Sequence, residues 1–132
     1  MSDLLILLGM QQAHICETLR EKLDQTVCPI LSKTELGQAD AMFSALKACC
    51  VQNSDAPAVQ WAKALRGELP PGAAPRTEVL TALNWLEWAV RLAIVRSIHQ
   101  KRSMLAALEM LAGAVDWLRR AYFAIAPVQP AA

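Results

Sequence analysis

The sequence lacks any apolar run long enough to span a membrane. A transmembrane helix needs roughly 18 or more residues with few or no charges, and the richest apolar stretch, residues 79–95, contains Asn84, Glu87 and Arg91. The apolar run at residues 4–8 is too short for the core of a signal peptide, and Asp3 precedes it where a basic residue is expected. We therefore expect a cytoplasmic protein with no membrane partner.

The C-x-x-C spacing of metal and redox sites is also missing. The four cysteines are Cys16, Cys28, Cys49 and Cys50. Neighbouring cysteines such as Cys49 and Cys50 rarely form a disulfide with each other, because its geometry strains the peptide between them. We expect free, buried thiols. Metal binding or redox use is the alternative.

Catalytic motifs are absent as well. His14 and His99 are the only histidines, and His14 lies two residues from Cys16, which places the two on different faces of a helix. No Gly-rich phosphate loop, H-E-x-x-H or G-x-S-x-G motif occurs. The sequence predicts a non-catalytic protein with no cofactor and no metal site. A small enzyme or metalloprotein that uses Cys and His is the alternative.

Helical periodicity, by contrast, runs through most of the chain, and we find no convincing strand. Apolar spacing and capping residues predict five helices, at about residues 3–24, 33–52, 55–67, 77–100 and 103–126. The P-P-G-A-A-P stretch at residues 70–75 is the only linker-like segment, and it is too short to separate two domains. At 132 residues we expect an all-α protein, a single compact bundle over residues 1–132.

The last two predicted helices need a turn between them. No Gly or Pro separates them, so the turn must come from His99, Gln100, Lys101 and Arg102, with Ser103 as the cap. The alternative is one uninterrupted helix over residues 77–126.

The last predicted helix is apolar on nearly every face. Its polar residues follow one narrow stripe, formed by Glu109, Gly113, Asp116 and Arg120. We expect the remaining faces to be covered by other helices or by another molecule. An apolar surplus of this kind predicts contact with a protein partner.

The four tryptophans carry the largest apolar surface. We expect core packing rather than base stacking for Trp85 and Trp117. For Trp61 and Trp88, an edge position is the alternative to core packing.

A basic zone stands out on a chain of net charge +1. No acid occurs between Glu87 and Glu109, whereas four cations do: Arg91, Arg96, Lys101 and Arg102. These side chains could follow a phosphate backbone, because an arginine fork can contact phosphate in two places. The alternative is a solvated helix end, since cations at a helix C-terminus complement its dipole.

Three segments of the sequence occur in the order of a known family. They are Gln11-Gln12-Ala13 in the first helix, Leu36-Gly37-Gln38-Ala39 with Phe43 after Pro29, and Trp117-Leu118-Arg119-Arg120 in the last helix. In this order they resemble the motifs of the small helical subunit of type III-B CRISPR effector complexes, the Cmr small subunit. The resemblance covers nearly the whole chain. Glu35 departs from it, because the family prefers Gly there.

Other alignments stay open. The closing motif can instead be placed at residues 78–89, with Glu87 where the family usually has Lys. Small subunits of type I and type IV complexes are helical bundles too.

The resemblance implies a non-catalytic subunit of a ribonucleoprotein that serves antiviral defence. Its partners would be the larger subunits, RNA or single-stranded nucleic acid, and further copies of itself. The expected nucleic-acid contacts are Arg91, Arg96, Lys101 and Arg102, then Arg119 and Lys47. The rival hypothesis is a protein-interaction module, such as a secretion chaperone, anti-activator or antitoxin, which needs the apolar surface and no basic face.

Overall fold

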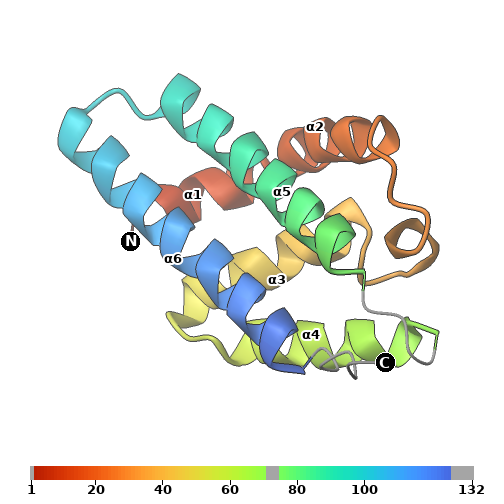
Figure 1. The fold of residues 1–132 in the computed structure, drawn as a ribbon. Helices are drawn as coiled ribbons and strands as arrows, with labels where there is room; N and C mark the ends of the chain where they lie inside the picture. Colours follow the sequence, from red (N-terminus) through yellow and green to blue (C-terminus); the bar gives the residue numbers. More distant parts are fainter. Residues whose placement is uncertain (1, 71–74, 126–132) are drawn as a thin grey trace.

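The chain is built from six α-helices and one short 3₁₀ turn in a computed structural model that describes residues 2–70 and 75–125. No strand occurs in these two ranges, so the all-α prediction is confirmed (Figure 1). In chain order the elements are α1 (Asp3–Met10), α2 (Gln12–Asp24), η1 (Leu31–Lys33), α3 (Ala39–Gln52), α4 (Ala56–Glu68), α5 (Arg76–Ser97) and α6 (Lys101–Ile125).

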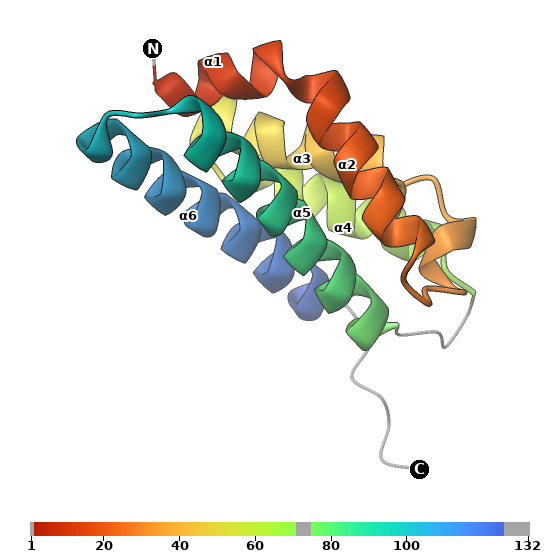
Figure 2. The same ribbon diagram turned by 90° about the horizontal axis from the view of Figure 1, so that it is seen from above.

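Five of these helices form a closed ring. In the ring α2 packs against α5, α5 against α6, α6 against α4, α4 against α3, and α3 against α2. α3 also contacts α5 and α6, and its Met42, Phe43 and Leu46 are completely buried. α1 lies across one end, where it touches α2, α3, α5 and α6 (Figure 2). Buried residues of all six helices join one hydrophobic cluster.

The first predicted helix is broken in the middle, so the helices number six rather than five. At Gln11 the backbone leaves the helical region, with φ −112° and ψ 17°. The side-chain Nε2 of Gln11 donates a hydrogen bond of 2.7 Å to Oγ of Ser97 at the end of α5. The break lets α1 turn across the end of the ring and bury Leu4 and Leu8 there.

The second predicted helix starts later than expected. The sequence predicts a start near residue 33, but α3 begins at Ala39, and turns occupy most of the preceding residues. A carboxylate from a distant helix explains this. Oε1 of Glu78 accepts hydrogen bonds from the backbone N–H groups of Ile30 and Leu31, at 3.0 and 3.1 Å. The N–H groups thereby find an acceptor outside a continuous helix.

A second carboxylate supports the end of the same segment. Glu68 accepts hydrogen bonds from the backbone N–H groups of Glu35 and Leu36, at 3.1 and 2.9 Å. The indole Nε1 of Trp61 donates to the carbonyl oxygen of Leu36 at 2.8 Å. Trp61 is only 4 % exposed, so it packs in the core rather than at an edge.

Gly37 fits where no other residue would. A Cβ added to it would lie 2.6 Å from both the side chain and the backbone oxygen of Leu31, and closer still to Oγ1 of Thr34. Thr34 is itself buried and accepts a hydrogen bond from the N–H of Gly37. Close packing therefore explains this glycine of the family-like segment.

The hairpin between the last two helices is confirmed. α5 ends at Ser97 and α6 begins at Lys101, two residues before the expected cap Ser103. Residues 71–74 of the predicted linker at residues 70–75, and the predicted helix end at Ala126, lie outside the described residues.

α6 is less covered than the sequence suggested. It packs against α3, α4, α5 and, near its start, α1, and part of its remaining face is left to solvent. On that face Leu105 is 51 % exposed and Met110 is 36 % exposed. Other helices of the chain therefore cover only part of the surface outside the polar stripe.

Candidate nucleic-acid interface

Three of the predicted cations gather where α5 turns into α6. Arg96 lies in the last turn of α5, and Lys101 and Arg102 form the start of α6. The turn between them is anchored by Ile98, which is only 8 % exposed. All three cations are exposed, and none makes an ion pair or a side-chain hydrogen bond with another described residue. We call Arg96, Lys101 and Arg102 the basic end.

The position of Lys101 and Arg102 contradicts the alternative explanation for their charge. The sequence allowed them to complement the dipole at the end of a helix, but they occupy the first turn of α6. Cations there face the positive end of the dipole, at a cost of about 0.3–1 kcal/mol each. The local helix does not account for these two charges. A bound anion would offset their cost.

Arg91 and Arg119 lie elsewhere and are already paired. Glu87 forms ion pairs with both, at 3.3 Å to Arg91 and 3.7 Å to Arg119. Arg119 also donates a hydrogen bond of 2.8 Å to the side-chain oxygen of Asn84. Arg91 pairs with Glu87 within α5, whereas Arg119 links α6 to Glu87 and Asn84 of α5. Both cations therefore stand apart from the basic end.

Lys47 is also separate from the basic end. It lies on α3, and its Nζ donates to Oε1 of Gln12 on α2 at 3.3 Å. The structure therefore brings together three of the six predicted nucleic-acid contacts.

The tryptophan rings next to α2 are occupied by a cation of the chain itself. Trp85 and Trp88 meet edge to face, with ring centroids 5.4 Å apart. Nζ of Lys22 lies 5.2 Å from the centroid of each ring. Both rings, like Trp117, are half-buried. Lys22 takes the place in which an external cation would sit.

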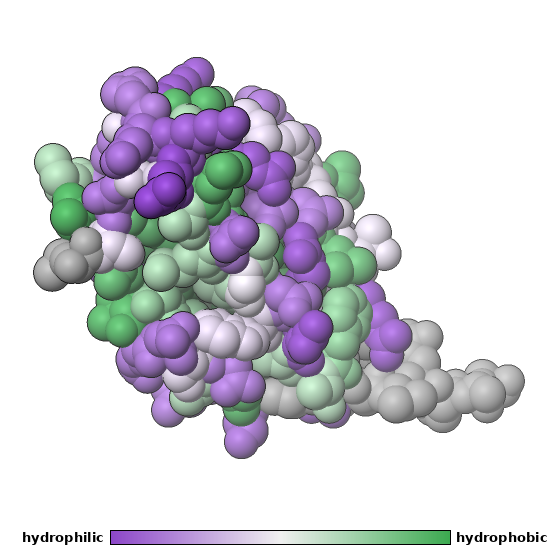
Figure 3. All heavy atoms as spheres, turned by 90° about the vertical axis from the view of Figure 1, so that its left-hand side faces the viewer, coloured by the Kyte–Doolittle hydropathy of each residue, from purple (hydrophilic) through white to green (hydrophobic). Residues whose placement is uncertain are grey.

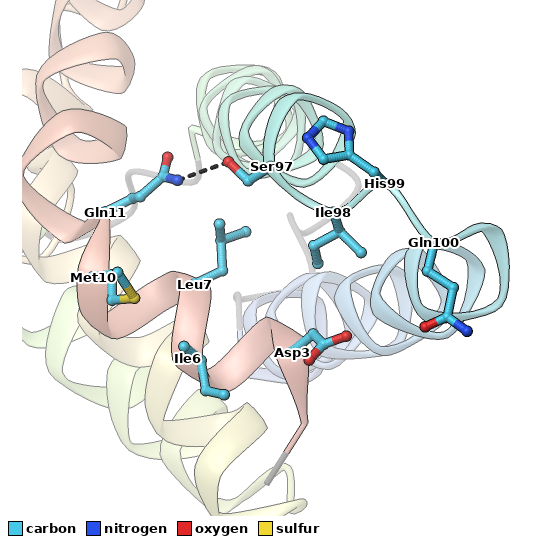
Figure 4. A pocket seen from close by; sticks show the side chains of 9 residues that line it. All are labelled: Asp3, Ile6, Leu7, Met10, Gln11, Ser97, Ile98, His99 and Gln100. Atoms are coloured by element: carbon cyan, nitrogen blue, oxygen red, sulfur yellow. Dashed lines mark hydrogen bonds between the residues drawn. The ribbon is translucent and has the colours of Figure 1, made fainter.

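An apolar hollow beside the basic end was missed by the sequence analysis. It has a volume of about 380 Å³ and lies between α1 and the α5–α6 turn (Figure 4). Ile6 and Met10 of α1 line it and are 43 % and 80 % exposed. The run of apolar residues at 4–8 was the available signal, because a helix apolar on successive residues cannot bury them all on one face.

A second hollow, of about 260 Å³, lies between α1 and α6 and is lined by Ala106 and Met110. Asp3 borders both hollows. Figure 3 shows this end of the molecule, where hydrophobic residues surround a depression and hydrophilic residues crowd above it.

The cysteines are free and buried, as the sequence predicted. Burial raises the pKa of Cys16 to about 11, with a further contribution from its hydrogen bond to Asp40. Burial likewise raises the pKa of Cys50 to about 11. Thiols with such pKa values stay protonated near neutral pH, and the thiolate is the nucleophilic form.

Residues 2–70 and 75–125 contain no group of three or more His, Cys, Asp or Glu side chains placed to hold a metal ion. Over the same ranges, no helix combines the length and the apolar character needed to cross a membrane.

Comparison with known proteins identifies no relative. No family model matches the chain, and neither a curated protein nor a solved structure shows significant similarity to it.

Proposed function

We propose that the protein is a non-catalytic cytoplasmic subunit of a ribonucleoprotein, and that its basic end contacts the phosphate backbone of RNA. The observation that carries the proposal is the unpaired state of Arg96, Lys101 and Arg102, two of which oppose the dipole of their own helix. Contacts of this kind position a protein on nucleic acid without reading its sequence.

The resemblance to the small subunit of CRISPR effector complexes supports the same proposal from the sequence side. Within such an assembly the protein would lie beside the guide RNA and its target, next to the larger subunits. Some family-like residues have packing roles here, since Gly37 and the carbonyl oxygen of Leu36 fix the turn before α3. The family-like motif therefore contributes to the fold, whereas we assign RNA binding to the basic end.

The test is RNA binding as a function of salt. Fluorescence anisotropy of a labelled single-stranded RNA of mixed sequence should show binding that weakens as salt rises. With three phosphate contacts, log K should fall against log salt with a slope of about −2. A single-stranded DNA of the same length should bind with a similar slope, because phosphates are the shared feature.

The decisive variant is Arg96→Glu combined with Lys101→Glu. It should lower the affinity for every RNA sequence by about the same factor. Glu at position 101 suits the first turn of a helix, so the variant should fold. Lys63→Glu is the matched control, because Lys63 is an exposed cation on α4. An affinity at low salt that is unchanged in the double variant would refute the assignment.

A protein-interaction module without nucleic acid is the second candidate. It is favoured by the exposed apolar residues of α1, above all Met10 at 80 % exposure. The two candidates differ in salt response, since an apolar interface persists at salt concentrations that release a phosphate-bound protein. A complex from the native host that survives high salt and contains no RNA would favour this second candidate.

A further inference from the structure

The larger hollow is continuous with the basic end. Residues 97–100 line it together with α1, and in the chain they lie directly between Arg96 and Lys101. A phosphate held by these cations would therefore have the hollow beside it. The base attached to that phosphate is the part of an RNA that can enter an apolar site.

The shape and lining of the hollow suit a small planar group. Leu7 and Ile98 form its buried floor, and Ile6 and Met10 form exposed apolar walls (Figure 4). Its volume of about 380 Å³ lies in the usual range of small-molecule sites, which also combine apolar walls with a few polar groups. The helix of a protein partner would need a longer groove along several helical turns.

Asp3 puts a negative charge at the edge of the hollow. It lies in the first turn of α1, is exposed and borders the hollow. Its carboxylate forms no ion pair with any residue that the structure describes. A carboxylate repels phosphate and accepts hydrogen bonds from N–H groups. The hollow therefore favours the N–H groups of a base, while phosphates favour the basic end.

Gln100 and His99 add a donor and a ring. Oε1 of Gln100 accepts a hydrogen bond of 3.1 Å from Oγ of Ser103, so its amide N–H groups can donate to an acceptor in the hollow. His99 is exposed and lines the same hollow. Histidine is one of the side chains on which unstacked bases of RNA stack.

We propose that this hollow binds one unstacked guanine base of an RNA held by the basic end. The Watson–Crick edge of guanine carries two neighbouring N–H donors beside a carbonyl oxygen. The carboxylate of Asp3 accepts from both donors, and Gln100 donates to the carbonyl oxygen. Uracil offers a single N–H between two carbonyl oxygens, which a carboxylate repels. Adenine and cytosine each place an acceptor nitrogen next to the amino group.

Guanine binding in the hollow rests on the proposed function, because the basic end must first hold the RNA. The cations would contact any sequence, and the hollow would add a preference for one base. The RNA would have to be single-stranded there, since pairing occupies the Watson–Crick edge.

The test compares short uridine RNAs of equal length that differ at one central position. One carries a guanosine there, one an inosine and one a further uridine. In fluorescence anisotropy at low salt, the guanosine RNA should bind at least about fivefold more tightly than the all-uridine RNA, the discrimination expected of one bidentate contact. The inosine RNA should fall between them, because inosine lacks the 2-amino group.

Asp3→Asn isolates the carboxylate. It should bring the affinities for the guanosine and uridine RNAs to within about twofold of each other. The slope of log K against log salt for the uridine RNA should stay unchanged, because the basic end is intact. Glu109→Gln is the matched control, since Glu109 is an exposed acid of α6 that does not line the hollow.

Ile6→Ser tests the apolar wall in the same assay. It should weaken binding of the guanosine RNA more than binding of the uridine RNA. Leu105→Ser is its control, because Leu105 is similarly exposed but lies outside the hollow. Circular dichroism should show that every variant keeps its helices.

Methyl NMR locates the base without RNA. Guanosine monophosphate should shift the methyl signals of Ile6 and Met10 and leave those of Leu105 in place. Uridine monophosphate at the same concentration should shift none of them.

The outcomes separate the two proposals. Equal affinity for the guanosine and uridine RNAs, with the expected salt slope, would refute the guanine site and leave the basic end standing; the hollow would then suit a protein partner. A guanosine preference that persists in Asp3→Asn would refute the role of Asp3 in recognising the base. If no RNA binds at low salt, the proposed function fails, and the methyl shifts with guanosine monophosphate decide the guanine site separately.

Discussion

The side-chain amide of Gln11 donates a hydrogen bond of 2.7 Å to the hydroxyl oxygen of Ser97, and so joins the break between α1 and α2 to the end of α5. Both residues border the larger hollow (Figure 4). The bond holds α1 across the end of the ring, and thereby sets the distance between α1 and the basic end.

Removing this hydrogen bond should loosen α1. We expect Gln11→Ala to lower the free energy of unfolding by about 0.5–1 kcal/mol, the usual contribution of one hydrogen bond. Hydrogen exchange of the α1 amides should increase more than that of α3. Gln60→Ala, at an exposed position of α4, is the control and should change neither quantity. Equal exchange rates in α1 of the variant and the wild type would contradict the role of this bond.

The carboxylate of Glu78 should matter far more than its half-exposed position suggests. Glu78→Ala leaves the N–H groups of Ile30 and Leu31 without their acceptor. Hydrogen bonds to charged groups contribute about 1.5–3 kcal/mol, so we expect a loss of that size in chemical denaturation. Glu78→Gln keeps an oxygen acceptor and should lose less. Glu21→Ala, at an exposed site of α2, is the control. A loss no larger than in this control would refute the anchoring role of Glu78.

Replacement by alanine should change the free energy of unfolding in opposite directions at two glycines. Gly37→Ala brings a Cβ against the side chain and backbone of Leu31, and should destabilise the fold by about 1–3 kcal/mol. At Gly67, inside α4, an added Cβ meets nothing within 4 Å. Gly67→Ala should therefore raise the free energy of unfolding, by up to about 1 kcal/mol. Thermal unfolding of both variants checks the pair, and a stable Gly37→Ala protein would contradict the packing described here.

The buried thiols should make the fold sensitive to alkaline pH. The pKa of Cys16 and of Cys50 is raised from 9.0 to about 11 in the folded protein. Above pH 9 the unfolded chain loses thiol protons that the folded chain keeps. The free energy of unfolding should therefore fall between pH 9 and 11, by at most about 1.4 kcal/mol per pH unit for each thiol.

The variant Cys50→Ala isolates one of these thiols. Its unfolding free energy should fall less steeply with pH than that of the wild type, whatever the offset between them at neutral pH. Parallel curves for the two proteins over this range would show that ionisation of Cys50 is not coupled to unfolding.

The parts of the fold that depend on local pattern were predictable from the sequence. Helical periodicity predicted α3, α4, α5 and α6. The turn between α5 and α6 was predicted at residues 99–102, and it lies at residues 98–100 because Lys101 and Arg102 already belong to α6. The parts that failed depend on distant residues. The break at Gln11 is held by Ser97, and the turn before α3 is held by Glu78. A local pattern carries no information about such partners.

In the candidate site, too, residues close in sequence were predicted and contacts between distant residues were not. The stretch without acidic residues between Glu87 and Glu109 indicated Arg96, Lys101 and Arg102 as candidate contacts. The structure places all three at the turn between α5 and α6. The sequence could not predict the ion pair between Glu87 and Arg119, which are 32 residues apart, because that pair forms only when α5 and α6 pack. Nor could it show the apolar hollows, which are made by helices from opposite ends of the described chain.

The closed ring of helices has a consequence for synthesis. α6 is the last described helix, and it fills the gap between α4 and α5. Until residues 101–125 leave the ribosome, the inner faces of both neighbours have nothing to cover them. The nascent chain is therefore an open arc with exposed apolar surface for most of its translation. Apolar surface exposed at this stage favours misfolding and aggregation, and the core of the described residues closes only when α6 packs onto its neighbours.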